Sequence, residues 1–193
     1  MLPAPPSGSR RTEHVHNSLH TSSGRRACAR LLGSRWPSIT LPTMSRGQVD
    51  LSSLTGLTVS FCYPRTAAPN ETITAEWNAI PGAQGCTPQA CSIRDEIDRF
   101  RQLRVEPLYG LSTQDTQYQH EARERLHLQH DLLSDEPLEF AMALKPPTFE
   151  WQGESIVKRL VLAVEEGKIV DVWYPVFRPY KSVKNVSEWL KAR

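Results

Sequence analysis

The sequence contains no long apolar run, only four cysteines and little net charge. No stretch approaches the roughly 20 apolar residues that a membrane-spanning helix needs, which argues against an integral membrane protein. The N-terminus has no apolar core of the kind found in secretory signal peptides, so we expect catalytic or buried thiols rather than structural disulfides. The formal net charge of +2 is too small to predict binding to nucleic acid or to a membrane surface.

The charge is unevenly distributed along the chain. Residues 1–49 contain seven arginines and one acidic residue, Glu13, so they carry +6 and the remainder carries −4. Residues 1–35 are rich in Ser, Arg, His and Pro without apolar periodicity, which predicts a disordered basic N-terminal extension. Residues 36–193 then form one domain. We expect a cytoplasmic protein, and the Arg- and Ser-rich start leaves organellar targeting as the alternative.

From residue 38 onward, predicted strands alternate with predicted helices. The β-branched and aromatic run 57–63 predicts a central strand. The segment 65–85 is rich in turn formers and unusually long for a compact domain, so we expect it to be functional. The alternation predicts a thioredoxin-like α/β fold with a central mixed β-sheet flanked by helices. The other predicted elements are a short hairpin turning at Arg46 and Gly47 or an extended entry there, a helix from about 88 to 104, strands at 105–112 and 131–135, a helix at 113–126, a hairpin of 156–164 with 168–174, and a helix at 187–192.

The segment 85–95 carries the clearest chemical signal. Cys86 follows a loop and precedes a helix, where unpaired backbone N–H groups and the positive end of the helix dipole stabilise a thiolate. Cys91 lies five residues later, which is about 7.5 Å along the axis of a regular helix. A disulfide needs Cα atoms closer than about 7 Å, so the pair can bridge only if the helix start unwinds. Taken alone, Cys91 fits equally well a thiol that faces the core.

The stretch 85–91 (GCTPQAC) resembles the peroxidatic motif of the bacterioferritin-comigratory, or peroxiredoxin Q, branch of the peroxiredoxins. Further segments between about residue 38 and residue 175 resemble this family in the same order. The resemblance implies a thiol peroxidase for hydrogen peroxide and organic hydroperoxides, with Cys86 as the peroxidatic thiolate and Cys91 as the resolving thiol. It also implies that Arg159 holds the thiolate, that thioredoxin or a glutaredoxin-type protein is the reductant, and that a monomer works without cofactor or metal.

One spacing departs from the family pattern, which places Pro seven residues and Thr or Ser three residues before the peroxidatic cysteine. These positions hold Ala79 and Ala83 here. Pro64 stands 22 residues before that cysteine, which corresponds to an insertion of 15 residues. We hypothesise that the inserted loop folds back so that Thr66 donates a hydrogen bond to peroxide. Pro81 is a rival for the proline that shields the site.

Two other functions fit parts of the pattern. A thioredoxin-like disulfide oxidoreductase would have Cys-x-x-Cys at the helix start, whereas four residues separate Cys86 from Cys91. A non-enzymatic redox sensor on the same scaffold stays open, because a fold alone does not fix a function. We expect Cys62 to lie in the core and Cys28 to be a spare thiol beside the extension. We expect His120, His127 and His130 to be exposed to solvent and to bind no metal. Trp77 and Trp151 either line the active site or pack in the core.

Overall fold

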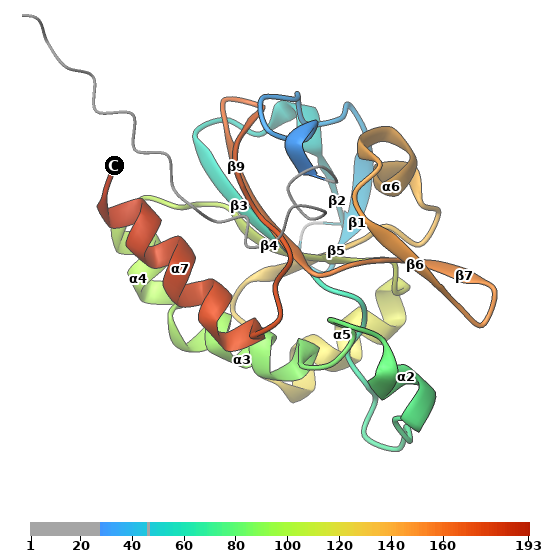
Figure 1. The fold of residues 1–193 in the computed structure, drawn as a ribbon. Coiled ribbons are helices and arrows are strands. Elements are labelled where there is room, and N and C mark those ends of the chain that lie inside the picture. Colours follow the sequence, from blue (N-terminus) through green and yellow to red (C-terminus); the bar gives the residue numbers. More distant parts are fainter. Residues whose placement is uncertain (1–27, 46) are drawn as a thin grey trace, which may run out of the picture.

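The structure is a computed structural model that describes residues 28–45 and 47–193. No helix in these two ranges is long and apolar enough to cross a membrane. The elements, drawn in Figure 1, are β1 (Thr40–Thr43), β2 (Gly47–Asp50), the 3-10 helix η1 (Leu51–Ser53), β3 (Leu57–Cys62), α2 (Ala75–Ala79), α3 (Cys86–Asp95), α4 (Ile97–Gln102), β4 (Leu108–Ser112), α5 (Thr116–Arg125), β5 (Asp131–Ser134), α6 (Glu139–Leu144), β6 (Thr148–Trp151), β7 (Glu154–Val157), β8 (Leu160–Glu165), β9 (Lys168–Trp173) and α7 (Pro179–Lys191).

A mixed sheet in the order β2-β1-β5-β4-β3-β8-β9 forms the centre of the molecule. Strands β3, β4 and β5 run parallel, whereas β8 pairs antiparallel with both β3 and β9. Helices α3, α4, α5 and α7 cover one face of the sheet, and α6 lies on the other (Figure 1). The predicted α/β architecture with a central mixed sheet is therefore confirmed.

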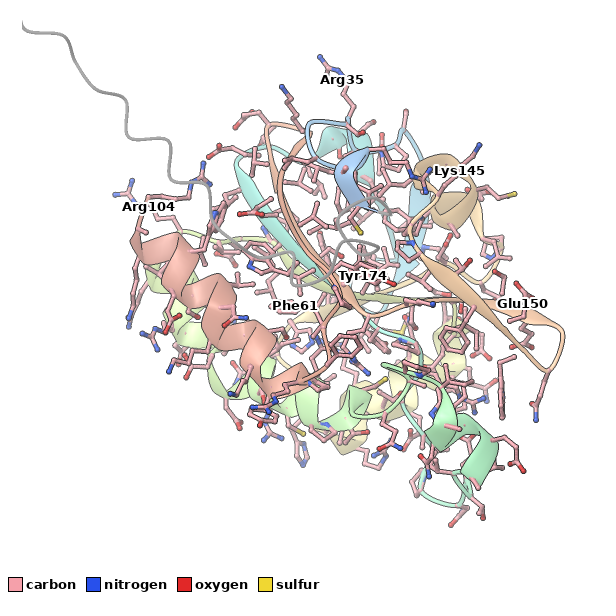
Figure 2. The ribbon with its side chains drawn as sticks, in the orientation of Figure 1. Arg35, Phe61, Arg104, Lys145, Glu150 and Tyr174 are labelled. Atoms are coloured by element: carbon pink, nitrogen blue, oxygen red, sulfur yellow. The ribbon has the colours of Figure 1, made fainter. Side chains whose placement is uncertain are left out.

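Alternating residues of β3 divide the core into two halves. Val59 and Phe61 belong to a cluster that includes apolar residues of α3, α4 and α7. Cys62 belongs to a second cluster, which includes Trp36 and the α6 residue Phe140. This alternation follows from the two-residue side-chain period of a strand. Phe61, labelled in Figure 2, thus lies on the face of the sheet that carries α3.

The folded part includes residues that the sequence assigned to the disordered extension. Residues 28–35 were expected to belong to a disordered extension, but Cys28 and Leu31 are each only 1% exposed. Both side chains pack in the core cluster that contains Cys62. The expected boundary after residue 35 is therefore wrong, because two apolar side chains at a spacing of three contact the sheet. Residues 1–27 and the expected turn residue Arg46 lie outside the described residues.

The long segment between β3 and α3 contains a helix that the sequence did not predict. Helix α2 begins after Thr74, whose hydroxyl accepts a hydrogen bond from the backbone N–H of Trp77 at 3.2 Å. The Trp77 ring packs against Phe149 and Trp151 of the hairpin formed by β6 and β7, with ring centroids 5.8 and 5.2 Å apart. The two tryptophans, whose roles were left open, therefore pack against one another and fix the inserted segment to this hairpin.

Several predicted boundaries differ from the structure. The predicted 88–104 helix breaks near Glu96 into α3 and α4, and α6, β6 and β7 were not predicted. The last helix begins at Pro179 rather than at residue 187. Proline suits the first turn of a helix because its missing N–H would have no partner there. The buried apolar residues of α7, namely Val183, Val186, Trp189 and Leu190, recur at helical spacing from this earlier start.

Candidate active site

Cys86 is the first residue of α3. Gly85 before it has a φ of +89°, a left-handed backbone conformation that residues with side chains rarely adopt. A Cβ atom at Gly85 would also come within 2.7 Å of Cγ of Pro179 on α7. Glycine is therefore required both by the turn and by the close approach of α7. The turn places the thiol at the positive end of the α3 dipole, which stabilises an anion.

The guanidinium group of Arg159 lies against the sulfur of Cys86. Its Nη2 atom is 2.9 Å from Sγ of Cys86, and it also donates to the carbonyl oxygens of Gln84 at 2.9 Å and Gly82 at 3.4 Å. Arg159 is only 2% exposed, and an arginine side chain keeps its charge in proteins. The structure therefore pairs a buried sulfur with a fixed cation.

Arg159 and Lys158 lie in a bend between β7 and β8, not within one continuous strand. The backbone N–H of Lys158 donates to the carbonyl oxygen of Pro147 at 2.8 Å, which holds the bend against the residues before β6. The prediction of a single strand over 156–164 is therefore wrong. Of the two basic neighbours, Arg159 contacts Cys86, while the Lys158 side chain stays half-buried.

A chain of buried hydrogen bonds connects Arg159 to α7. The Nη1 atom of Arg159 donates to Oε1 of Gln89, and Nε2 of Gln89 donates to Oγ of Ser182 at 3.1 Å. Oγ of Ser182 in turn donates to the carbonyl oxygen of Pro179 at 2.6 Å. Sequence reasoning missed both residues. Gln89 could have been found, because it lies three residues after Cys86 and so on the same helix face, whereas nothing local distinguishes Ser182.

Cys91 lies further along α3 and is partly exposed. It packs against the small cluster that contains Tyr63, Cys86 and Leu126. Arg94 on the same helix and Arg125 at the end of α5 both interact electrostatically with Cys91. Cys86 and Cys91 are free thiols in this structure. They therefore share one helix and one cluster, with positive charge near each of them.

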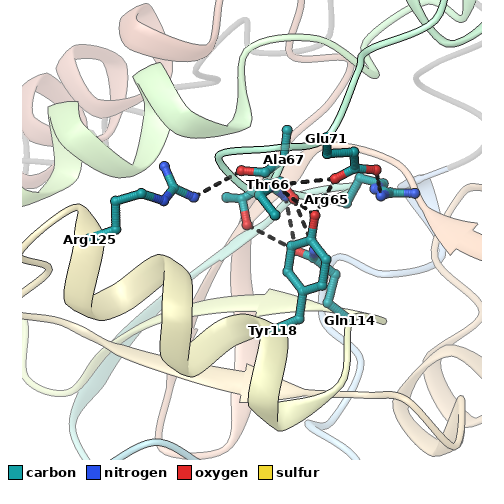
Figure 3. Close-up of polar contacts among 8 residues, drawn as sticks. Arg65, Thr66, Ala67, Glu71, Gln114, Tyr118 and Arg125 are labelled. Carbon is teal, nitrogen blue, oxygen red and sulfur yellow. Dashed lines mark hydrogen bonds and ion pairs between the residues drawn. The ribbon is translucent and has the colours of Figure 1, made fainter.

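Thr66 takes part in a different network, which Figure 3 shows. Its backbone N–H donates to Oε1 of Gln114 at 2.9 Å, its hydroxyl donates to the same oxygen at 3.3 Å, and Nε2 of Gln114 donates to the Thr66 carbonyl oxygen at 3.0 Å. Nearby, Arg65 forms an ion pair with Glu71, whose carboxylate also accepts a hydrogen bond from Tyr118. These contacts fix residues 65–71 to α5 and to the segment before it, so they do not support the predicted peroxide-binding role of Thr66.

The residues at the two family positions before Cys86 contribute differently. Ala79 lies in α2, whereas Ala83 is buried and its carbonyl oxygen is 3.5 Å from Sγ of Cys86. Pro81, the rival for the shielding proline, is exposed, whereas Pro64 is buried. The exposure of Pro81 argues against a shielding role for it.

The other thiols and one histidine are buried. Burial raises the pKa of the Cys28 and Cys62 thiols to about 12, and the carboxylate of Asp135 also raises that of Cys62. Cys62 is in the core as predicted, whereas Cys28 is not a peripheral thiol. His130 is 3% exposed, contrary to the expected solvent exposure, and its burial lowers its pKa to about 4. Within residues 28–45 and 47–193, no group of three or more His, Cys, Asp and Glu side chains could hold a metal ion.

The sequence matches the Redoxin family over residues 31–190. The chain belongs to the Redoxin family. This match begins at Leu31, which agrees with the burial of that residue in the core. The chain is 32% identical over 101 residues to peroxiredoxin Bcp of Escherichia coli strain K12, which covers 52% of this chain and 54% of the relative.

Two further known proteins resemble the chain, one in sequence and one in fold. Chloroplastic peroxiredoxin Q of rice, Oryza sativa subsp. japonica, is 30% identical over 118 residues, which is 60% of this chain and 47% of the relative. The match thus spans about half the length of these curated relatives. The crystal structure of peroxidoxin BcpB from Mycobacterium tuberculosis superposes with a TM-score of 0.67 at 23% identity, over 83% of this chain and 96% of that one. The thioredoxin-like peroxiredoxin fold is thereby confirmed.

Proposed function

We propose that this protein is a thiol peroxidase that reduces hydrogen peroxide and organic hydroperoxides. The observation that carries the proposal is the contact of Arg159 Nη2 with Sγ of Cys86 at the start of α3. A fixed cation and a helix N-terminus both favour a thiolate, which is the form that attacks peroxides. A structural relative, the bacterioferritin comigratory protein of Xanthomonas campestris, is described as having alkyl peroxide reduction activity. That description supports organic hydroperoxides as substrates.

In the first step, the Cys86 thiolate attacks the terminal oxygen of the hydroperoxide. An S–O bond forms and the O–O bond breaks, so the thiolate is oxidised to a sulfenic acid and the peroxide is reduced. The departing oxygen takes up a proton from solvent and leaves as water or an alcohol. Arg159 would stabilise the negative charge that develops on this oxygen, as a fixed cation in a buried site does.

In the second step, the Cys91 sulfur attacks the sulfenic sulfur of Cys86. An S–S bond forms, the S–O bond breaks, and the hydroxyl group leaves as water with the proton of the Cys91 thiol. Both cysteines belong to α3, so the first helical turn must unwind before the bond can close. Because one chain carries both thiols, we propose that a monomer completes the cycle.

In the third step, an external dithiol of the thioredoxin or glutaredoxin type reduces the disulfide and is itself oxidised to a disulfide. Cytoplasmic and organellar compartments that keep such dithiols reduced would suit the cycle. Thr66 has no catalytic role in this proposal, because its hydroxyl donates to Gln114. We propose instead that Thr66 anchors the inserted loop.

The decisive experiment measures peroxide consumption by the full chain with a thioredoxin reducing system. We expect turnover by the wild type, none by Cys86→Ser, and a single oxidation without recycling by Cys91→Ser. Cys62→Ala is the matched control, because it removes a buried thiol from the other face of the sheet.

Two outcomes would redirect the proposal. Stoichiometric oxidation of the folded wild type without turnover would support a redox sensor, the alternative kept open because Ala83 stands where the family pattern has Thr or Ser. An oxidised state that links Cys86 to Cys28 or Cys62, or that joins two chains, would overturn the resolving role of Cys91.

A further inference from the structure

The first turn of α7 contacts the candidate active site at two points. Pro179 packs against the Gly85 turn, where even a Cβ atom would approach its Cγ to 2.7 Å. Ser182, one turn later, is 3% exposed and accepts a hydrogen bond from Nε2 of Gln89 at 3.1 Å. Gln89 is itself 1% exposed and accepts a hydrogen bond from Arg159. A hydroxyl group on α7 is therefore two hydrogen bonds away from the cation that contacts Cys86.

The direction of each hydrogen bond is fixed by its neighbours. A serine hydroxyl has one proton, and Ser182 donates it to the Pro179 carbonyl oxygen at 2.6 Å. Ser182 can therefore only accept from Gln89, so the amide NH₂ group of Gln89 must point toward α7. The amide oxygen of Gln89 must then point toward Arg159, which has only donors. Without the hydroxyl, Nε2 of Gln89 would lose its acceptor on α7, and the contact with Arg159 alone would hold the Gln89 side chain in place.

We propose that Ser182 is a positioning residue, which sets the orientation of the Gln89 amide and thereby holds Arg159 against the Cys86 sulfur. This role rests on the proposed peroxidase function, because the reaction that Ser182 would affect is the oxidation of Cys86 by peroxide. Ser182 touches neither Cys86 nor peroxide in this role. Helix α7 would thus control the reactivity of Cys86, although Ser182 lies 93 positions after Gln89 in the chain and Cys86 lies before Gln89.

The electrostatic surroundings of Cys86 make its reactivity a suitable measure of this effect. Arg159 approaches it from the bend between β7 and β8, and Tyr63 interacts with it from the end of β3. Cys91 shares its helix and is replaced by serine for the measurement. Cys28 and Cys62 should not contribute to the measured alkylation or oxidation near neutral pH, because burial raises the pKa of each thiol to about 12.

The test compares Ser182→Ala with Ser187→Ala in the full-length Cys91→Ser chain. Ser187 is the matched control, because it lies on the same helix, is 2% exposed, and its hydroxyl has no hydrogen-bond partner among the described residues. The readouts are the alkylation rate of Cys86 by iodoacetamide as a function of pH and the rate of its oxidation by hydrogen peroxide. Thermal melting verifies that each variant is folded.

We expect Ser182→Ala to move the midpoint of the alkylation profile upward by about half to one pH unit and to slow oxidation by about 3- to 10-fold. Ser187→Ala should match the parent in both readouts. In a Gln89→Met background, which has lost both amide hydrogen bonds, Ser182→Ala should have no further effect.

Equal effects of Ser182→Ala and Ser187→Ala would overturn the proposal, as would an effect of Ser182→Ala that persists in the Gln89→Met background. The alkylation profile does not depend on turnover with peroxide. A chain that lacks peroxidase activity but shows the expected alkylation shifts would refute the proposed function and leave the positioning role of Ser182 intact.

Discussion

The two pairs of cysteines lie on opposite faces of one sheet, and the sulfurs of Cys62 and Cys86 differ in the charges beside them. Cys28 and Cys62 pack in the core cluster on the α6 side, whereas Cys86 and Cys91 pack among side chains of α3 and its neighbours. Cys86 is 5% exposed and Cys62 is fully buried, so both sulfurs are largely removed from water. Burial therefore does not separate the two sites.

The difference lies in the sign of the nearest charge. Sγ of Cys86 is 2.9 Å from the cation Arg159, whereas the charge that acts on Cys62 is the carboxylate of Asp135. Burial without a cation disfavours the thiolate. A buried cysteine becomes a candidate nucleophile only where the fold also supplies a positive group and a helix N-terminus.

Selective alkylation should show the largest difference between the pairs. In the reduced native protein at about pH 8, iodoacetamide should modify Cys86 and Cys91 about 1,000-fold faster than Cys28 and Cys62. The reason is that burial raises the pKa of the latter thiols to about 12. Peptide mass spectrometry after timed labelling measures the rates, and unfolding the protein should equalise them. Comparable native rates for all four thiols would contradict the comparison.

Replacing the cation should bring Cys86 closer to the behaviour of Cys62. We expect Arg159→Met to slow oxidation of Cys86 by hydrogen peroxide by about 100-fold, since a fixed charge is lost from a buried site. Lys158→Met is the matched control and should react like the wild type, because this neighbour does not contact the sulfur. Quenched-flow mass spectrometry gives the rates. A slow Lys158→Met variant, or a fast Arg159→Met variant that melts normally, would refute the role of Arg159.

His130 is a buried base, so burial should change its pKa in the opposite direction from that of the buried thiols Cys28 and Cys62. Its pKa falls from 6.5 to about 4 because burial disfavours the charged ring. Between these values the unfolded chain binds more protons, so the stability present above pH 6.5 should decrease as the pH falls, by about 3 kcal/mol at pH 4. Urea unfolding across this range measures the change. His130→Gln should show a flatter dependence, and an equal slope in both proteins would exclude this assignment.

The smallest expected effect concerns the turn that positions Cys86. Gly85→Ala should lower the free energy of unfolding by about 2 kcal/mol more than Gly153→Ala. The two glycines have similar φ values, +89° and +85°, but only a Cβ at Gly85 would meet Pro179. Denaturant unfolding compares the variants, and Gly85→Ala should also slow the oxidation of Cys86. Equal losses of stability at both positions would show that the contact with α7 is unimportant.

The site was partly predictable from sequence because some of its features are local. The placement of Cys86 depends on a glycine turn and a helix start that adjoin each other in the chain. The resemblance of residues 158–170 to the family's strand hairpin then suggested Arg159 without any knowledge of its contacts. The role suggested for Thr66 at the peroxide stays a prediction, and in the structure its backbone N–H and its hydroxyl both donate to Gln114.

By itself, the sequence determined the alternation of strands and helices, the position of Cys86 at a helix start, and its separation from Cys91. These features depend on side-chain periodicity and turn chemistry within a few residues. Only the tertiary structure decided which charge faces each sulfur, that Ser182 contacts Gln89, and that His130 is buried. Such contacts join residues far apart in the chain, as the separation of 73 positions from Cys86 to Arg159 illustrates. They are set by how the helices pack on the sheet, which no local pattern specifies.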